Sequence, residues 1–93
     1  MIEIVKFQTP NCRPCREVQF ILDRLAEQLV GKDIVFSVVN AVDEPDRTKS
    51  LGIVSAPTVV LFKDGYETHR FVGTLFKETD YLAAIESLLS TSA

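Results

Sequence analysis

The sequence predicts one α/β domain with the element order β-α-β-α-β-β-α, in which a mixed four-stranded sheet carries helices on both faces. Three observations lead to this prediction. The chain has 93 residues, of which 46% are hydrophobic and 25% charged, a mixture typical of a single globular domain over residues 1–93. The hydrophobic period of the first half alternates between strand and helix. The second half contains Asp64-Gly65, a strong signal for an antiparallel hairpin.

The first half is expected to form a strand, a helix and a second strand. Residues 2–8 are rich in β-branched and aromatic side chains and end at the loop signal Thr9-Pro10-Asn11. The apolar positions after Cys15 recur every three or four residues, which predicts a helix that ends with Gly31 as a left-handed C-cap. Residues 34–39 are almost entirely apolar, so we expect a buried strand parallel to the first. The helical stripe consists of Val18, Ile21, Leu22, Leu25, Ala26 and Leu29.

The second half is expected to add a short helix, the hairpin and a last helix. Residues 44–51 predict the short helix, with Asp43 as its N-cap and Gly52 as its stop. Residues 58–62 and 68–72 are the two hairpin strands. The remaining apolar residues recur with a helical period over residues 77–89, and residues 90–93 are expected to fray.

Charge and composition exclude some classes of partner. The net charge of -3 and the pI near 5.0 give no basic field for a phosphate backbone, so we expect proteins or small thiols rather than nucleic acid. Residues 1–6 lack the long apolar segment of a signal peptide, and no stretch predicts a membrane span. We therefore expect a cytoplasmic protein, in which a closely spaced cysteine pair is redox-active or metal-binding rather than a structural link.

The motif Cys12-Arg13-Pro14-Cys15 falls where the first strand gives way to the first helix. Cys12 is then expected at the helix N-terminus, with Pro14 inside the first turn. Residues three apart on a helix have β-carbons about 5–6 Å apart, and a small adjustment brings two cysteines within disulfide distance. The pair can therefore open and close without refolding the chain.

The two sulfurs are expected to have different roles. Cys15 continues the buried stripe, whereas Cys12 lies at the helix end, where free N–H groups and the helix dipole favour a thiolate. Arg13 and Arg16 add positive charge nearby. Cys12 would attack a substrate disulfide and Cys15 would resolve the mixed disulfide, an exchange that needs no metal or organic cofactor.

The alternative to a redox pair is half of a zinc site. Structural zinc usually takes four ligands, and beyond Cys12 and Cys15 the sequence offers His69 and carboxylates. We therefore expect no metal. The strand-helix-strand pattern around the motif also favours the redox interpretation.

Beyond these cysteines, two further motifs make the chain resemble the thioredoxin family over nearly its whole length, without the extra N-terminal strand and helix of full-length members. The segment Ser55-Ala56-Pro57-Thr58 is similar to the family's cis-proline segment, and Val72-Gly73-Thr74 is similar to its glycine loop. The resemblance implies a cis Ala56–Pro57 bond that faces the cysteines, with backbone groups that pair with an extended substrate. The substrate surface that it implies consists of Asn11, Arg13, Pro14, Ala56, Pro57 and Gly73.

Three residues depart from the family pattern. Asn11 stands where thioredoxins usually have tryptophan, and Arg13 stands where they have glycine. Lys6 occupies the position of a buried aspartate that handles the proton of the resolving thiol, and its side chain either lies near Cys15 or turns to the surface. Positive charge at Lys6 and Arg13 favours the thiolate, so we expect a weaker reductant than an ordinary thioredoxin.

Two other functions remain open from the sequence. Thr9-Pro10-Asn11-Cys12 is similar to glutaredoxins, which implies a glutathione-dependent redoxin, although the segment after Gly73 is closer to thioredoxin. A non-catalytic module that binds a partner through the proline groove is the third candidate. For the favoured function, a monomeric oxidoreductase of protein disulfides, the resemblance implies thioredoxin reductase or glutathione as electron donor.

Overall fold

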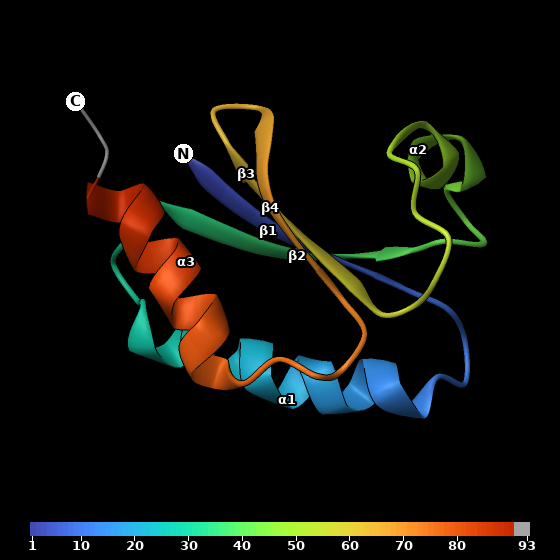
Figure 1. Ribbon diagram of the computed structural model, residues 1–93, viewed down its shortest axis with the longest axis horizontal. Coiled ribbons are helices and arrows are strands. Elements are labelled where there is room, and N and C mark those ends of the chain that lie inside the picture. The colour runs from blue at the N-terminus through green and yellow to red at the C-terminus, as the bar shows by residue number, and fades with distance from the viewer. Residues whose placement is uncertain (91–93) are drawn as a thin grey trace.

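The computed structural model describes residues 1–90 and contains the predicted order of strands and helices (Figure 1). The elements are β1 (Ile2–Gln8), α1 (Arg13–Gln28), β2 (Ile34–Asn40), α2 (Pro45–Ser50), β3 (Thr58–Lys63), β4 (Tyr66–Val72) and α3 (Glu78–Ser90).

The four strands form one mixed sheet in the order β2-β1-β3-β4. β1 runs parallel to β2 and antiparallel to β3, and β3 runs antiparallel to β4. The hairpin turns at Asp64 and Gly65, whose φ angles of 52° and 87° suit the type I′ turn that an Asp-Gly pair favours. The predicted mixed sheet is confirmed.

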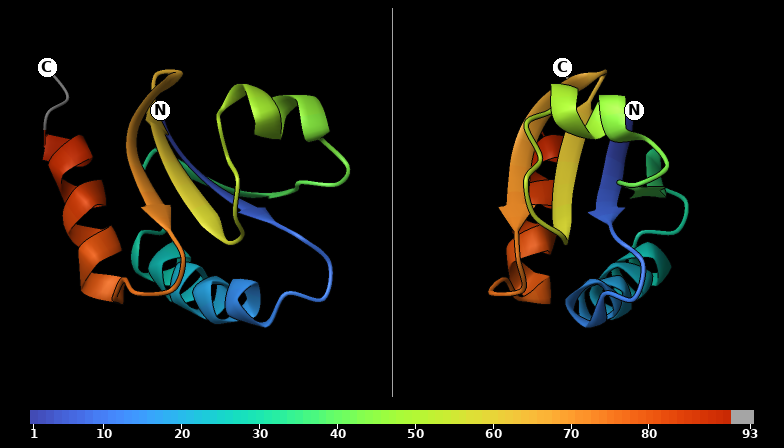
Figure 2. Two further views of the ribbon diagram at one scale, coloured as in Figure 1. Left: turned by 45° about the vertical axis from the view of Figure 1, so that its right-hand side comes forward. Right: turned by 90° about the vertical axis from the view of Figure 1, so that its right-hand side faces the viewer.

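Helices cover both faces of this sheet, as predicted. α1 and α3 lie on one face and the short helix α2 lies over the other, which is clear when the sheet is seen from two sides (Figure 2). Side chains of β1 point alternately to the two faces of the sheet. Ile2 and Ile4 pack with α1 and α3, whereas Val5 and Phe7 pack in the smaller cluster on the opposite face. Lys6 shares the face of Ile2 and Ile4, under α1.

Residues 34–39 form a strand as predicted, but the prediction that this strand is buried was wrong. β2 is an edge strand, and the side chains of Val35 and Val38 are 45% and 48% exposed while Val39 is buried. An apolar run identifies a strand through its β-branched residues, but the place of that strand in the sheet depends on distant pairing partners.

Three predicted helix ends also need correction. α1 ends at Gln28 with Leu29 as its C-cap, and Gly31 takes its positive φ of 87° in the turn that follows. The N-cap of α2 is Glu44 rather than Asp43, because the N–H groups of both residues bind the Asn40 carbonyl in a preceding turn and the helix begins only after it. Ser90, predicted in the frayed tail, is the last residue of α3, and residues 91–93 lie outside the described part.

Candidate active site

Three chain segments meet at one end of the sheet. Phe7 near the end of β1 pairs with Thr58 at the start of β3, and Thr58 pairs with Val72 at the end of β4. The loop that leads into α1, the segment before β3 and the segment after β4 therefore leave the sheet side by side (Figures 1 and 2). The Gly73 N–H donates a 2.9 Å hydrogen bond to the Pro57 carbonyl, which ties the last two segments together.

Cys12 and Cys15 form a disulfide at the start of α1, with their α-carbons 5.2 Å apart, within the usual range for this bond. Cys12 is the N-cap residue and is partly exposed, whereas Cys15 is only 2% exposed. Pro14 lies in the first helical turn, as expected. Cys12 is therefore the more accessible of the two cysteines.

The helix N-terminus surrounds Cys12 with groups that favour negative charge. The Cys15 N–H donates a 3.1 Å hydrogen bond to the Cys12 sulfur, so an otherwise free N–H of the first turn points at this sulfur. The first turn of α1 contains no acidic residue, and Arg13 and Arg16 are exposed beside it. Both features stabilise a thiolate at Cys12 once the disulfide opens.

Lys6 lies beside Cys15, in the buried layer between β1 and α1. Its side chain is 2% exposed, and its Nζ donates a 3.2 Å hydrogen bond to the Cys15 carbonyl oxygen. Burial lowers the pKa of Lys6 from its ordinary value of 10.5, and the charge of Asp23 acts in the opposite, weaker direction. The sequence left two directions open for this side chain, and the structure places it inward.

The segment before β3 presents a cis Ala56–Pro57 bond. Pro57 is buried and Ala56 half-buried, and the Thr58 hydroxyl donates a 2.7 Å hydrogen bond to the Ser55 carbonyl. Among the hydrogen bonds of residues 1–90, none uses the N–H or carbonyl of Ala56. These backbone groups remain available to an extended chain laid along this edge.

Asn11, Arg13 and Pro14 are exposed around Cys12, and Asn11 takes a φ of 54° that helps to turn the chain into α1. Among the hydrogen bonds of the described chain, none joins these three residues to Ala56 or Gly73. The loop before α1 and the segments at Ala56 and Gly73 are thus separate parts of the site, with no hydrogen bond between them in the described chain.

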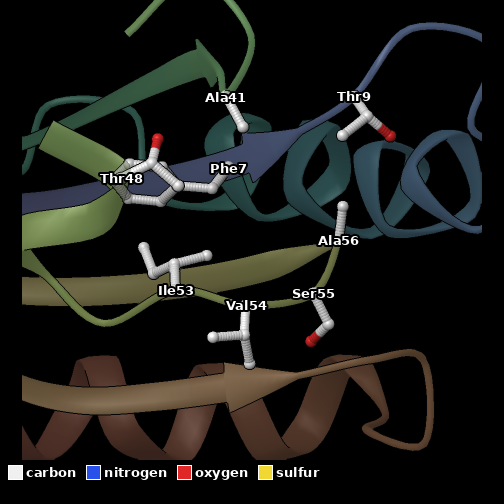
Figure 3. A pocket seen from close by; sticks show the side chains of 8 residues that line it. All are labelled: Phe7, Thr9, Ala41, Thr48, Ile53, Val54, Ser55 and Ala56. Carbon is white, nitrogen blue, oxygen red and sulfur yellow. The ribbon is translucent and has the colours of Figure 1, made fainter. Parts of the chain in front are cut away.

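A cavity of about 310 Å³ adjoins the Ala56 segment on the α2 face of the sheet (Figure 3). Its lining is mostly apolar, and Val54, 96% exposed, stands at its rim. Sequence reasoning missed this cavity, because it forms where β1, α2 and the segment before β3 meet. Its lining residues are Phe7, Thr9, Ala41, Thr48, Ile53, Val54, Ser55 and Ala56.

Across residues 1–90, no three His, Cys, Asp or Glu side chains are grouped as metal ligands. No helix in this part of the chain is long and apolar enough to cross a membrane.

Fold and site together define a small dithiol protein, with a Cys-x-x-Cys pair at a helix N-terminus and a cis-proline segment at the same end of the sheet. The family model Thioredoxin matches residues 2–87. The chain belongs to the thioredoxin family, which confirms the resemblance found in the sequence.

Similar proteins from several lineages support this assignment. Thioredoxin M3, chloroplastic, from Oryza sativa subsp. japonica is 38% identical over 89 residues, which are 96% of this chain and 50% of that protein. Thioredoxin 1 from a Nostoc strain is 38% identical over 76 residues, 82% of this chain and 70% of its own length. The chain thus spans about half the length of the rice relative and more of the bacterial one.

Solved thioredoxin structures share the fold. A mutant thioredoxin from Halobacterium salinarum aligns with a TM-score of 0.82 and 28% identity, over 94% of this chain and 74% of that one. The thioredoxin of Fasciola hepatica aligns with a TM-score of 0.79 and 27% identity, over 92% of this chain and 79% of that one.

Proposed function

We propose that this protein is a thiol-disulfide oxidoreductase that reduces or exchanges protein disulfides through a Cys12/Cys15 dithiol-disulfide cycle. The observation that carries the proposal is the asymmetry of the pair. A partly exposed Cys12 sulfur accepts a hydrogen bond from the helix N-terminus, and a buried Cys15 lies directly behind it. Membership of the thioredoxin family supports the same activity.

The exchange takes two steps. The Cys12 thiolate attacks one sulfur of a substrate disulfide, so a Cys12–substrate bond forms and the other substrate sulfur leaves and takes up a proton. Cys15, after losing its proton, attacks the Cys12 sulfur and releases the second substrate thiolate. Two electrons pass from the cysteine pair to the substrate, and the protein is left with the disulfide seen in the structure. Thioredoxin reductase or glutathione then restores the dithiol.

The substrate is proposed to lie as an extended segment across the site. The N–H and carbonyl of Ala56 supply main-chain pairing, since neither is used within residues 1–90. Pro57 and Gly73 shape the edge on one side of the sulfur. Asn11, Arg13 and Pro14 form the other side and give a polar, positively charged rim.

The cavity beside Ala56 suits an apolar side chain of that substrate. Phe7 and Ile53 supply apolar walls, and Thr48, whose hydroxyl donates to the Glu44 carbonyl, also lines the cavity (Figure 3). A substrate segment paired with Ala56 places alternate side chains on this face of the sheet. We therefore propose that substrates carry an apolar residue close to the reactive half-cystine.

Insulin reduction by dithiothreitol tests the activity. Wild type should accelerate the precipitation of the insulin B chain, and Cys12→Ser should abolish the acceleration. If wild type with both thiols reduced gives only the uncatalysed rate, the non-catalytic binding module becomes the better interpretation. Cys15→Ser should hold substrates at Cys12 as mixed disulfides, which mass spectrometry identifies.

The electron donor, the monomeric state and the location need separate measurements. Turnover with thioredoxin reductase or with glutathione and its reductase distinguishes the thioredoxin-like from the glutaredoxin-like cycle. Gel filtration tests the monomer. A cytoplasmic location stays a prediction from the sequence, and several relatives bear chloroplastic names.

A further inference from the structure

β2 forms an open edge of the sheet, and in the described chain its only neighbouring strand is β1. The seven residues Ile34–Asn40 include no charged residue, no proline and no glycine. Val35 and Val38 are 45% and 48% exposed, and Ser37 is exposed as well. Natural edge strands usually carry charges, prolines or bulges that keep other chains from pairing with them. β2 has none of these protections, and its register with β1 is regular throughout.

The opposite edge of the sheet, β4, is protected in both ways. It carries Glu67, His69 and Arg70. Its register with β3 shifts between Leu61 and Phe62. Charged side chains and an irregular register both oppose pairing with a further strand. The contrast indicates that β2, and not β4, is suited to receive another strand.

The hydrogen bonds at the ends of β2 show which of its backbone groups face outward. The Asp33 carbonyl and the Ala41 N–H are both bound to β1, so the odd-numbered residues of this segment turn their backbone groups towards β1. Phe36 and Val38 therefore turn their N–H and carbonyl groups away from the sheet. None of the hydrogen bonds described for residues 1–90 outside the ladder uses these groups.

The outermost groups of this edge are already used within the chain. The Ile34 N–H donates a 2.8 Å hydrogen bond to the Lys32 carbonyl. The Asn40 carbonyl accepts bonds of 3.0 and 3.2 Å from two N–H groups of the turn that follows. Ile34 thus offers only its carbonyl, and Asn40 only its N–H. The free donors of the edge are the N–H groups of Phe36, Val38 and Asn40, and the free acceptors are the carbonyls of Ile34, Phe36 and Val38.

We propose that the β2 edge pairs with the β2 edge of a second copy of this chain, antiparallel about a twofold axis at Ser37. Phe36 of one copy then lies opposite Val38 of the other, and Ile34 lies opposite Asn40. Every free donor meets a free acceptor. The two groups that are already used, the Ile34 N–H and the Asn40 carbonyl, fall opposite each other. A shift by two residues in either direction leaves a backbone group of Phe36 or Val38 unpaired.

The side chains are complementary in the same register. On the face that α1 covers, Phe36 of one copy lies beside Val38 of the other. On the α2 face, Val35 lies beside Val39. Aromatic and β-branched side chains in such cross-strand pairs stabilise an antiparallel ladder. The pairing would therefore cover the two half-exposed valines, Val35 and Val38.

One strand from each copy makes a small interface. Stable complexes bury about 1,200 Å² or more, so we expect a reversible dimer with a dissociation constant on the order of 100 μM. The dilute protein is then the monomer expected from the sequence. The reactive cysteines lie beyond the ends of β1 and β2, and an antiparallel pair directs these ends in opposite directions. Dimerisation thus leaves both sites accessible, and it can be tested independently of the proposed function.

Sedimentation equilibrium of the oxidised protein tests the proposal, at concentrations from about 5 μM to about 1 mM, on either side of the expected dissociation constant. The average mass of wild type should rise towards twice the monomer mass. Cys12 and Cys15 are the only cysteines and are bonded to each other, so disulfide-linked dimers do not contribute. In NMR spectra over the same range, the amide signals of Phe36, Val38 and Asn40 should shift, and those of β4 should not.

Variants at Ser37 test the register, because this exposed residue faces its own copy across the axis. Ser37→Lys places like charges opposite each other, so the dissociation constant should rise at least about fivefold. About 1 M salt should reduce this effect by screening the charges. Mixing Ser37→Lys with Ser37→Glu should restore pairing, because opposite charges then meet. Thr68→Lys adds the same charge at an exposed hydroxyl residue of β4 and should leave the dissociation constant unchanged.

The proposal is overturned if wild type stays monomeric throughout this range and the β2 amide signals do not move, which would leave the edge to a strand of another protein. It is also overturned if Ser37→Lys and Thr68→Lys weaken the dimer equally, or if the mixed Ser37 variants do not pair. A mass that grows beyond the dimer would contradict it as well, because joining the two β2 edges leaves only the protected β4 edges.

Discussion

Replacing Lys6 with Met should stabilise the oxidised protein. Lys6 is 2% exposed, and the substitution keeps most of the apolar part of its side chain but removes the amine. Within residues 1–90 that amine donates one hydrogen bond, to the Cys15 carbonyl. Losing a hydrogen bond from a charged donor costs about 1.5–3 kcal/mol, whereas burying the ion costs several kcal/mol. We expect a net gain of about 1–3 kcal/mol at pH 7, and each kcal/mol raises Tm by about 4–8 °C in a domain of this size.

The gain should shrink as the pH rises. The pKa of Lys6 is lowered by burial in the folded protein and takes its ordinary value of 10.5 in the unfolded chain. Below the folded-state pKa both states are charged, and wild type bears the full cost of burial. Between the folded-state pKa and 10.5 the unfolded chain binds more protons, so wild-type stability rises with pH, by about 1.4 kcal/mol for each unit by which the pKa is lowered. The stability of Lys6→Met lacks this rise with pH, because methionine does not titrate.

Urea unfolding of both oxidised proteins at several pH values between 6 and 10 measures the effect as a difference in free energy of unfolding. Lys49→Met, at an exposed position, should stay within about 0.5 kcal/mol of wild type throughout. The reasoning is refuted if Lys6→Met is less stable than wild type at pH 7 with an unchanged m-value. It is equally refuted if the difference between the two proteins grows with pH.

Three further predictions concern other parts of the molecule. Arg13→Gly removes positive charge beside the Cys12 thiolate, so the reduction potential should fall by on the order of 10 mV in a glutathione redox titration, and an unchanged or higher potential contradicts this account. Gly73→Ala places a side chain at a φ of 87° with nothing within 4 Å of the new β-carbon, so stability should fall by about 1–2 kcal/mol in urea unfolding from backbone strain alone. Leu25→Ala, at a fully buried position of α1, should cost about 2–5 kcal/mol in the same assay, and a loss below 1 kcal/mol would contradict its place in the core.

Local signals made much of the fold predictable. β1 matches its expected bounds because residues 2–8 are bracketed by a clear loop signal, and the hairpin follows from Asp64-Gly65 alone. The edge position of β2 was not predictable in this way, since Val35 and Val38 have the same chemistry whether a neighbouring strand covers them or not. Whether Asp43 or Glu44 caps α2 depends on a turn closed by Asn40, which the capping preference does not contain.

The site likewise has features that local sequence predicts and features that depend on the tertiary fold. The asymmetry of Cys12 and Cys15 follows from helix periodicity, which is a local property. The direction of Lys6 follows in part from strand alternation, which puts it on the face of Ile2 and Ile4, but only the tertiary fold lays α1 over that face. The cavity beside Ala56 requires three separated segments, so no local pattern contains it.

The positive charges beside the two cysteines lie in different surroundings. Their effects should therefore respond differently to the salt concentration. Arg13 is exposed beside Cys12, where ions screen charges over about 10 Å at 0.1 M salt and about 3 Å at 1 M. Lys6 is buried against Cys15, where mobile ions do not enter. Raising the salt concentration from 0.1 to 1 M should therefore reduce the effect of Arg13→Gly on the reduction potential. The effect of Lys6→Met on the free energy of unfolding should persist, and its disappearance at high salt would mean that Lys6 acts from the surface.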